Sequence, residues 1–529
     1  MHDDDAGTLV LNHDLVRPPV SHAIPTALGV SAAALALAAC GGDSAPAAAP
    51  VVPPPVIVPT VKITPTQAGR FLAQSTMGAT AADIVSVQTL GFDGWLTDQF
   101  NTARKIAHWD WMVGAGYNVA ANSNSETGYD PSVWRQLIGG TDQLRQRVGT
   151  LLDQVTTNAG MGLYLTYLGN VKDNPTTGSV PDENYARELM QLFTLGLYQI
   201  NSDGSLMMSG GAPIETYTQD DVSGLARVWT GWTVDSSDST TPDRYRRPMV
   251  NIAANHETGT KVFLKTTIPA NTSGVDSKKL ALDAIFAHPN IAPFVSKQLI
   301  QRLVTSNPSA PYIGRVAAVF ADNGSGVRGD LKAVVRAVLL DTEARDDAAA
   351  AASTTSGKLR EPIARLTGWA RAYGATSPSD AWAIGDTSSS STRLAQSPGR
   401  SQSVFSWFRP GYTPPNSAIA TAGLVAPEFQ LTSEPTVVAY INYMQSLIVN
   451  GAGDFKADYT AITAKAADSQ ALLDDINLTL AANQLSAATI AQIKTAVDSI
   501  ASSTPAGLAN RVYTAILLVL ASPEYLVLK

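Results

Sequence analysis

The sequence predicts a mainly α-helical protein, in which a large multi-helix body carries a small β-hairpin or ribbon. From Thr66 onward, apolar residues recur at three- and four-residue spacing over most of the chain, which is the period of helices buried along one face. The exception is Leu197–Met208, where two short apolar runs flank an Asp203-Gly204 turn and predict a hairpin. With 529 residues, 45% hydrophobic and 16% charged, the chain can bury a sizeable core.

The individual helices follow from the same periodicity, with apolar side chains on one face of each segment. Between them, Arg247–Lys265 is more extended, Ser388–Gln402 predicts a mobile loop, and Asp454–Thr504 is Ala-rich and helical. The predicted helices are Gly69–Gln74, Ala81–Thr89, Gly94–Asn101, Tyr185–Leu195, Val222–Trp232, Ser277–Phe286, Ala292–Val304, Tyr312–Ala321, Leu331–Leu340, Leu359–Tyr373, Pro435–Val449 and Pro505–Ala521.

The N-terminus predicts a signal peptide over residues 1–39. Its apolar run, Ala27–Ala39, is too short to span a bilayer as a helix. The run ends in Leu37–Cys40, which resembles the lipobox of bacterial lipoproteins, so Cys40 is the expected site of lipidation. Because the first sixteen residues hold four Asp and no Lys or Arg, we place the translation start near Val16.

Two further segments complete the predicted organisation. Residues 40–64 are rich in Pro, Ala and Val and predict an extended tether, at about 3.1 Å per residue, that holds the body off a membrane. Residues 65–529 form one helical domain.

Charge and residue counts exclude several classes of function. The formal net charge is −8 without a dense basic block, so no nucleic-acid partner is expected. A single cysteine excludes a disulfide framework, an iron–sulfur cluster and a thiolate zinc site. Beyond residue 39 the only histidines are His108, His256 and His288, so no paired-histidine metal motif can form. No motif in the sequence identifies a cofactor.

Five separated motifs occur in the order Arg70–Gln74, Pro181–Gly196, Tyr217–Val222 continuing to Thr230–Trp232, Ser406–Tyr412 and Ala521–Tyr525. Together they resemble a bacterial family called domain of unknown function 1800, over about residues 65–529. The resemblance implies a secreted or envelope-attached helical protein, with a sulfatase-like partner of the domain of unknown function 1501 family, and it implies no known reaction. The chain departs from the family at Arg147–Leu152, where relatives carry several more helical turns.

The polar face of the helix predicted at Tyr185–Leu195 supplies the first candidate site residue, Glu188. Asp182 is a suitable N-cap and Gly196 a suitable C-terminal residue for this helix. A solvated polar face accounts for Glu188 equally well, since exposed ion pairs contribute only about 0.3–0.5 kcal/mol each.

The next candidates, Asp220 and Asp221, lie at the start of the following helix. Thr218 and Asp221 have the form of a capping box, which already explains Asp221 and leaves Asp220 unexplained. Trp229 and Trp232, three residues apart, fit a core stripe better than a sugar-stacking platform.

The densest group of titratable residues is His256, Glu257 and Lys261, in an irregular segment. His256 beside Glu257 could be a general base with its orienting carboxylate, or part of a metal site. The competing interpretation is a loop histidine that bonds to backbone.

Two hypotheses of function follow. The first is a lipid-anchored bacterial envelope protein that acts in binding or assembly. The alternative is an envelope hydrolase that acts on a polysaccharide or ester through Glu188, Asp220, Asp221, His256 and Glu257, which we expect in one shared polar cleft. If the cleft binds a metal, these oxygen-rich ligands favour Ca²⁺ or Mn²⁺ over Zn²⁺.

Overall fold

The computed structural model describes residues 62–152, 165–401 and 403–529. The expected signal peptide, Cys40 and nearly all of the tether lie outside these ranges. The described residues belong to one compact unit that begins at Val61, and they are mainly helical, as predicted. None of the helices in the described ranges is both long and apolar enough to cross a membrane.

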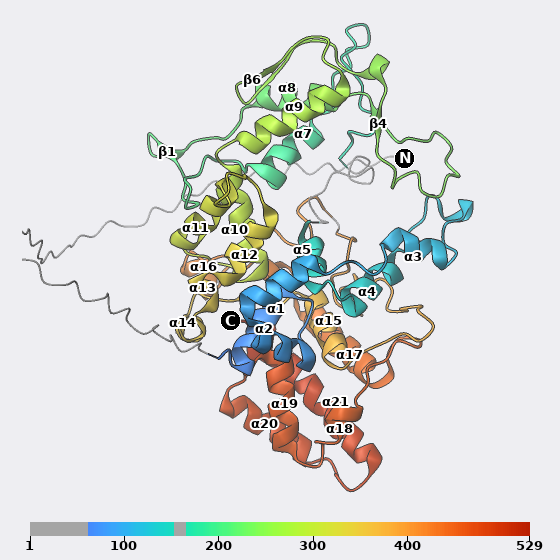
Figure 1. Ribbon diagram of the computed structural model, residues 1–529, viewed down its shortest axis with the longest axis vertical. Helices are drawn as coiled ribbons and strands as arrows, with labels where there is room; N and C mark the ends of the chain where they lie inside the picture. Colours follow the sequence, from blue (N-terminus) through green and yellow to red (C-terminus); the bar gives the residue numbers. More distant parts are fainter. Residues whose placement is uncertain (1–61, 153–164, 402) are drawn as a thin grey trace, which may run out of the picture. The chain divides into compact units, whose positions relative to one another are not determined.

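The first of two hydrophobic cores is built by helices from the N-terminal half of the body and the helices that follow the ribbons (Figure 1). The predicted apolar face at Tyr185, Leu189 and Met190 is buried in it, and so are Trp229 and Trp232. The elements are α1 (Pro65–Ser75), α2 (Ala81–Asn101), α5 (Gln143–Leu152), α7 (Asn184–Glu188), η2 (Leu189–Thr194), α8 (Gln219–Ala226), η3 (Arg227–Trp229), β5 (Lys261–Phe263), β6 (Thr266–Ile268), α9 (Gly274–Ala287), α10 (Ile291–Leu303), α11 (Ala310–Ala321), α12 (Leu331–Leu340) and α13 (Thr342–Arg345).

The second core is built mainly by C-terminal helices, and α1 packs against both groups through its contacts with α2 and α19 (Figure 1). Its elements are α4 (Tyr129–Gly139), α15 (Pro362–Ala372), α17 (Glu434–Asn450), α18 (Thr460–Thr463), α19 (Ser469–Ala481), α20 (Ala487–Asp498), α21 (Pro505–Ala521) and α22 (Pro523–Leu526).

The predicted ribbon is present as short antiparallel pairings. Ile200 pairs with Leu206 across the Asp203-Gly204 turn, as the sequence predicts. The remaining elements outside the cores are α3 (His108–Gly114), η1 (Ala120–Asn122), β1 (Met208–Ser209) paired with β2 (Ala212–Pro213), β3 (Trp232–Thr233) paired with β4 (Val250–Asn251), η4 (Ala253–Asn255), α14 (Asp347–Ala352), β7 (Lys358–Leu359) paired with β8 (Val527–Leu528), α16 (Ala418–Thr421) and η5 (Pro427–Leu431).

Four local features differ from the predicted helices. The helix expected over Val222–Trp232 ends as α8 at Ala226 and continues as η3 to Trp229, and Trp232 lies in β3. The helix expected from Leu359 begins only at Pro362, because Leu359 pairs with Val527 in a two-stranded sheet. The two helices expected around residue 91 are joined across a kink at Gly91, whose φ is 75°. The helix that carries Glu188 continues as a π-helical turn, η2, and ends at Gly196 with φ 81°.

Candidate functional site

The structure places His256 and Glu257 in one buried polar cluster around Thr230. The His256 ring engages both of its nitrogens, with Nδ1 3.0 Å from the Thr230 carbonyl oxygen and Nε2 3.4 Å from the Ser277 hydroxyl. The backbone N–H of Glu257 donates to the Thr230 hydroxyl at 2.8 Å. Burial lowers the pKa of His256. The neutral imidazole therefore joins the segment after η3 to α9.

The Glu257 carboxylate closes the loop that leads into β5. It accepts the N–H of Gly259 at 2.8 Å and that of Asp173 at 3.4 Å. Burial raises the pKa of Glu257, but these N–H groups and the charges of Arg227 and Lys261 outweigh burial and lower it overall. The Lys261 ammonium is buried beside this loop, where burial lowers its pKa and it donates to the Gly259 carbonyl at 3.4 Å. The side chains of His256, Glu257 and Lys261 thus stabilise the loop that leads into β5.

Asp221 is fully used in holding α8, and Asp220 is exposed to solvent. One Asp221 carboxylate oxygen accepts the backbone N–H and the hydroxyl of Thr218 at 2.7 and 2.8 Å, which confirms the predicted capping box. The other oxygen accepts the N–H of Leu264 at 2.7 Å and so fixes the β5–β6 turn against the helix.

Glu188 is half-buried at the end of α7. Burial raises the pKa of Glu188 against the opposing charge of Arg187. Its Oε2 atom is buried and has no hydrogen-bond partner among the described residues. Nearby, burial raises the pKa of Tyr217 to about 12, and its hydroxyl donates to Gln191 at 3.3 Å. Glu188 is therefore the least explained of the predicted site residues.

An ion pair on the same helix contributes to its packing. Arg187 Nη2 lies 3.1 Å from Glu183 Oε2, and the Gln219 amide donates to the same Glu183 oxygen at 2.7 Å. Ser223 donates to the other Glu183 oxygen at 2.5 Å. This network holds α7 against α8.

Taken together, His256 and Glu257 meet at Thr230, while Asp221 binds the β5–β6 turn. Within the described ranges, no group of three or more His, Cys, Asp or Glu side chains is arranged to hold a metal ion. Glu188, Asp220, Asp221 and His256, the ligands expected if the cleft binds a metal, therefore do not form a metal site in the described ranges. A cleft shared by Glu188 and His256 stays a prediction.

A cavity of about 680 Å³, which the sequence did not predict, lies between the ribbon, α10 and the segments near residues 410 and 424. Its walls include Gly196 and Gly411, each from one of the motifs behind the family resemblance. The lining is otherwise mainly apolar, with Leu197, Leu206 and Phe294 among its side chains. Lys297, on α10, is the one charged residue among the described residues that line it.

Lys297 is a half-buried lysine without a counter-ion. Within the described part of the chain, no hydrogen bond, ion pair or aromatic ring engages its ammonium. Burial alone lowers the pKa of Lys297 below the ordinary lysine value of 10.5. A cation that has lost hydration without gaining a partner is poised to bind an anion. The sequence does not reveal this arrangement, because the cavity is formed by segments more than 200 residues apart.

Buried charges gather at the end of α10, where Gln301 lines the cavity. Lys358 Nζ is 2.9 Å from Glu428 Oε1 and donates to the Arg302 carbonyl at 2.6 Å. Arg147, which is also buried, donates to the same carbonyl at 3.1 Å. The Arg302 guanidinium lies 4.1 Å from the centre of the Phe408 ring. These contacts join the end of α10, next to the cavity residue Gln301, to β7, α5 and η5.

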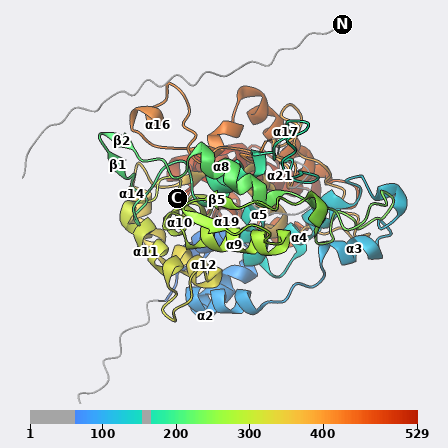
Figure 2. The same ribbon diagram turned by 90° about the horizontal axis from the view of Figure 1, so that it is seen from above.

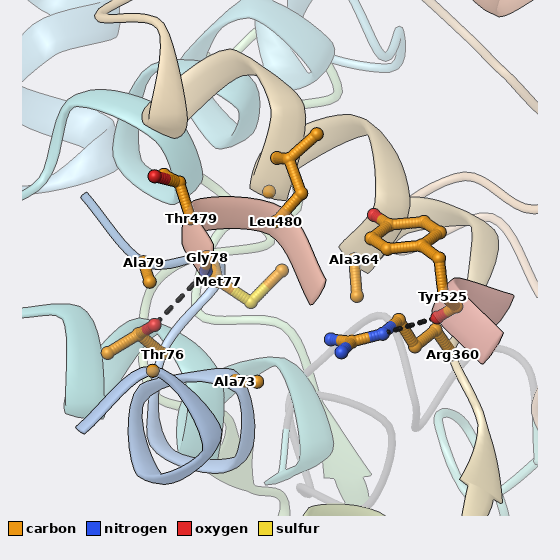
Figure 3. A pocket seen from close by; sticks show the side chains of 12 residues that line it. Ala73, Thr76, Met77, Gly78, Ala79, Arg360, Ala364, Thr479, Leu480 and Tyr525 are labelled. Atoms are coloured by element: carbon orange, nitrogen blue, oxygen red, sulfur yellow. Dashed lines mark hydrogen bonds between the residues drawn. The ribbon is translucent and has the colours of Figure 1, made fainter. Parts of the chain in front are cut away.

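A second cavity lies between α1, α15 and α19 (Figure 3). Its volume is about 30 Å³, which is room for only about two water molecules. Small residues line much of it, and Arg360 Nε crosses its edge to donate to the Tyr525 carbonyl at 2.7 Å. This space is too small for a substrate, so the larger cavity is the better candidate site.

A family model described as a protein of unknown function (DUF1800) matches residues 124–527. No curated protein and no solved structure matches the chain.

Proposed function

The chain belongs to the DUF1800 family, whose description assigns no reaction. We propose from the sequence that it is a lipid-anchored bacterial envelope protein, and from the geometry that it binds a small amphipathic anion. The observation that carries this proposal is the unpaired Lys297 in the cavity of about 680 Å³. The ligand has an apolar body that fills the cavity and one anionic group that pairs with the ammonium.

Size and lining support a small molecule. Ligand cavities in proteins span about 300–1,000 Å³ and combine apolar walls with a few polar groups that fix orientation. Here Leu197, Leu206 and Phe294 supply apolar wall, while Gln298 and Lys297 lie one after the other on α10. The buried ion pair of Lys358 and Glu428 is bonded to the end of the same helix through the Arg302 carbonyl.

The location rests on the sequence. Leu37–Cys40 resembles a lipobox, and a lipid on Cys40 anchors the chain at the outer membrane or the periplasmic face of the envelope.

The family resemblance adds a protein partner of the sulfatase-like domain of unknown function 1501 family. Co-purification of that partner with the wild-type chain, and its loss after deletion of residues 61–529, tests this part.

The alternative of an envelope hydrolase has less support from the geometry. Both ring nitrogens of His256 are engaged, and the Glu257 carboxylate accepts two backbone N–H groups. A general base needs a free nitrogen or oxygen within reach of the proton that it removes. Among the buried candidates only Glu188 keeps such an oxygen, because its Oε2 atom has no hydrogen-bond partner among the described residues. The binding function therefore has the better claim.

Fluorescence titration of residues 41–529 with 1-anilinonaphthalene-8-sulfonate, an apolar dye with one sulfonate, tests the proposal. We expect saturable binding at one site that decanoate displaces and decanol does not. Lys297→Met should weaken dye binding at least tenfold, about the contribution of 1.4 kcal/mol that one charge-assisted contact makes. Lys279→Met, at an exposed lysine on α9, is the matched control. Equal affinity in wild type and Lys297→Met would overturn the proposal.

A further inference from the structure

The ribbon that borders the cavity exposes an unusual amount of apolar side chain. Leu197, Leu206, Met207 and Met208 have exposed fractions of 48, 47, 38 and 54%. The eleven residues Gly204–Ile214 contain no charged side chain. In both views, β1 and β2 extend away from the helices around them (Figures 1 and 2). The tip of the ribbon, Gly210-Gly211, therefore carries no charge and follows the exposed apolar side chains of Met207 and Met208.

The ribbon is tied to the body at its base. Asn290 donates to the carbonyls of Leu195 and Tyr198 at 3.1 and 2.8 Å, and the Thr216 N–H donates to the Leu197 carbonyl at 2.9 Å. Its base is thus fixed to α10, whereas Met207 and Met208 near the tip are not among the described residues that line the cavity of Lys297. Their exposure is not explained by the core or by the proposed ligand.

We propose that this ribbon inserts its tip into the surface of a lipid bilayer and so holds the mouth of the cavity against the membrane. Uncharged loops with Met and Leu side chains can enter the interface without desolvating a charge, and binding grows with the apolar area that is buried. A second copy of the chain or a protein partner could also cover the ribbon, but neither needs a charge-free tip, because protein interfaces have polar rims.

The expected anchor is compatible with this contact. The 25 residues from Cys40 to Thr64 span at most about 90 Å when fully extended. A chain held at the membrane by such a leash meets the bilayer at high effective concentration, so weak insertion of the ribbon is sufficient. The inference concerns the ribbon alone and does not depend on the cavity ligand.

Vesicle binding of residues 41–529 tests the inference, because this part of the chain contains the whole compact unit from Val61 and lacks both the signal peptide and Cys40. We expect co-sedimentation with vesicles of phosphatidylethanolamine and phosphatidylglycerol. Met207→Ser with Met208→Ser should reduce the partition coefficient about tenfold, since each methionine loses part of its buried apolar area. Val437→Ser with Val438→Ser, at two exposed valines of α17, should not change it.

A fluorophore gives a second readout. Residues 41–529 contain no cysteine, so Ser209→Cys places a single environment-sensitive dye at the tip, and Ser325→Cys places it on a distant exposed loop. Vesicles should shift the emission of the dye to the blue at residue 209 and not at residue 325. No vesicle binding, equal binding by the methionine variant, or self-association that the methionine variant abolishes would each overturn the inference. The dye titration above is done without lipid, so the two proposals fail separately.

Discussion

The ammonium of Lys358 and a carboxylate oxygen of Glu428 lie 2.9 Å apart, and the two side chains are only 2 and 1% exposed. The pair joins β7 to η5 next to the C-terminal end of α10, where Lys358 also donates to the Arg302 carbonyl. Glu361, with an oxygen 3.9 Å from the same ammonium, is held by Gln396 at 2.8 Å. Burial lowers the pKa of Lys358 while the charges of Glu428 and Glu361 oppose that effect. A buried charge network thus joins β7 and η5 to the end of α10.

The first prediction removes one charge of this pair. Lys358→Met should lower the free energy of unfolding by about 3–5 kcal/mol, because it leaves Glu428 buried without its cation. Lys358→Met combined with Glu428→Gln should recover part of that loss. Urea denaturation measures both. Lys494→Met breaks an exposed pair with Asp498 and should cost less than about 1 kcal/mol. If Lys358→Met lowered the free energy of unfolding no more than Lys494→Met does, the buried network would be contradicted.

The second prediction concerns the close approach of α8 and β5. A Cβ on Gly224 would lie 1.7 Å from the Val262 carbonyl oxygen, so Gly224→Ala must push the strand from the helix. We expect it to lower the free energy of unfolding by about 1–3 kcal/mol or more, the usual cost of overpacking. At Gly114, a Cβ meets nothing within 4 Å, and Gly114→Ala should be neutral. Thermal melts followed by circular dichroism compare them; equal melting temperatures would refute the contact.

The third prediction is a pH dependence set by His256. The folded pKa is below the ordinary value of 6.5 because the ring is buried, so between these pH values the unfolded chain binds a proton that the folded chain does not. Stability is therefore fully present above pH 6.5 and is lost as pH falls toward the folded pKa.

His256→Gln should flatten the decline in unfolding free energy between pH 7 and about pH 5. Burial and Lys265 lower the pKa of His288 too, so some slope should remain in that variant. Urea titrations at a series of pH values measure the slopes. An unchanged slope in His256→Gln would show that the ring titrates normally.

Sequence periodicity predicted most of the body because apolar faces repeat wherever helices pack on a core. It did not predict α4 (Tyr129–Gly139), although Trp134 and Leu137 are buried there, because polar residues interrupt the apolar period. Capping chemistry was local and therefore accurate at Thr218.

The candidate site was harder to predict. His256 and Glu257 were found by residue type, yet their partners Thr230 and Ser277 lie 26 and 21 residues from His256. Lys297 gave no signal at all. Lys297 stands out because it has no counter-ion among the described residues and lies in a cavity whose walls come from distant segments. Both properties arise from tertiary packing and not from the local sequence.

The last prediction uses the titration of Lys297 itself. An anionic ligand needs the ammonium protonated, and burial lowers the pKa of Lys297 below 10.5. Affinity for 1-anilinonaphthalene-8-sulfonate, whose sulfonate stays ionised throughout, should therefore fall as pH rises through this lowered pKa, before an ordinary lysine loses its proton. Lys297→Arg keeps its charge to much higher pH, so its affinity should stay constant over the same range. Titrations from pH 7 upward, with circular dichroism to follow folding, separate loss of the charge from unfolding. An identical decline in wild type and Lys297→Arg would place the titrating group elsewhere and remove Lys297 from the binding site.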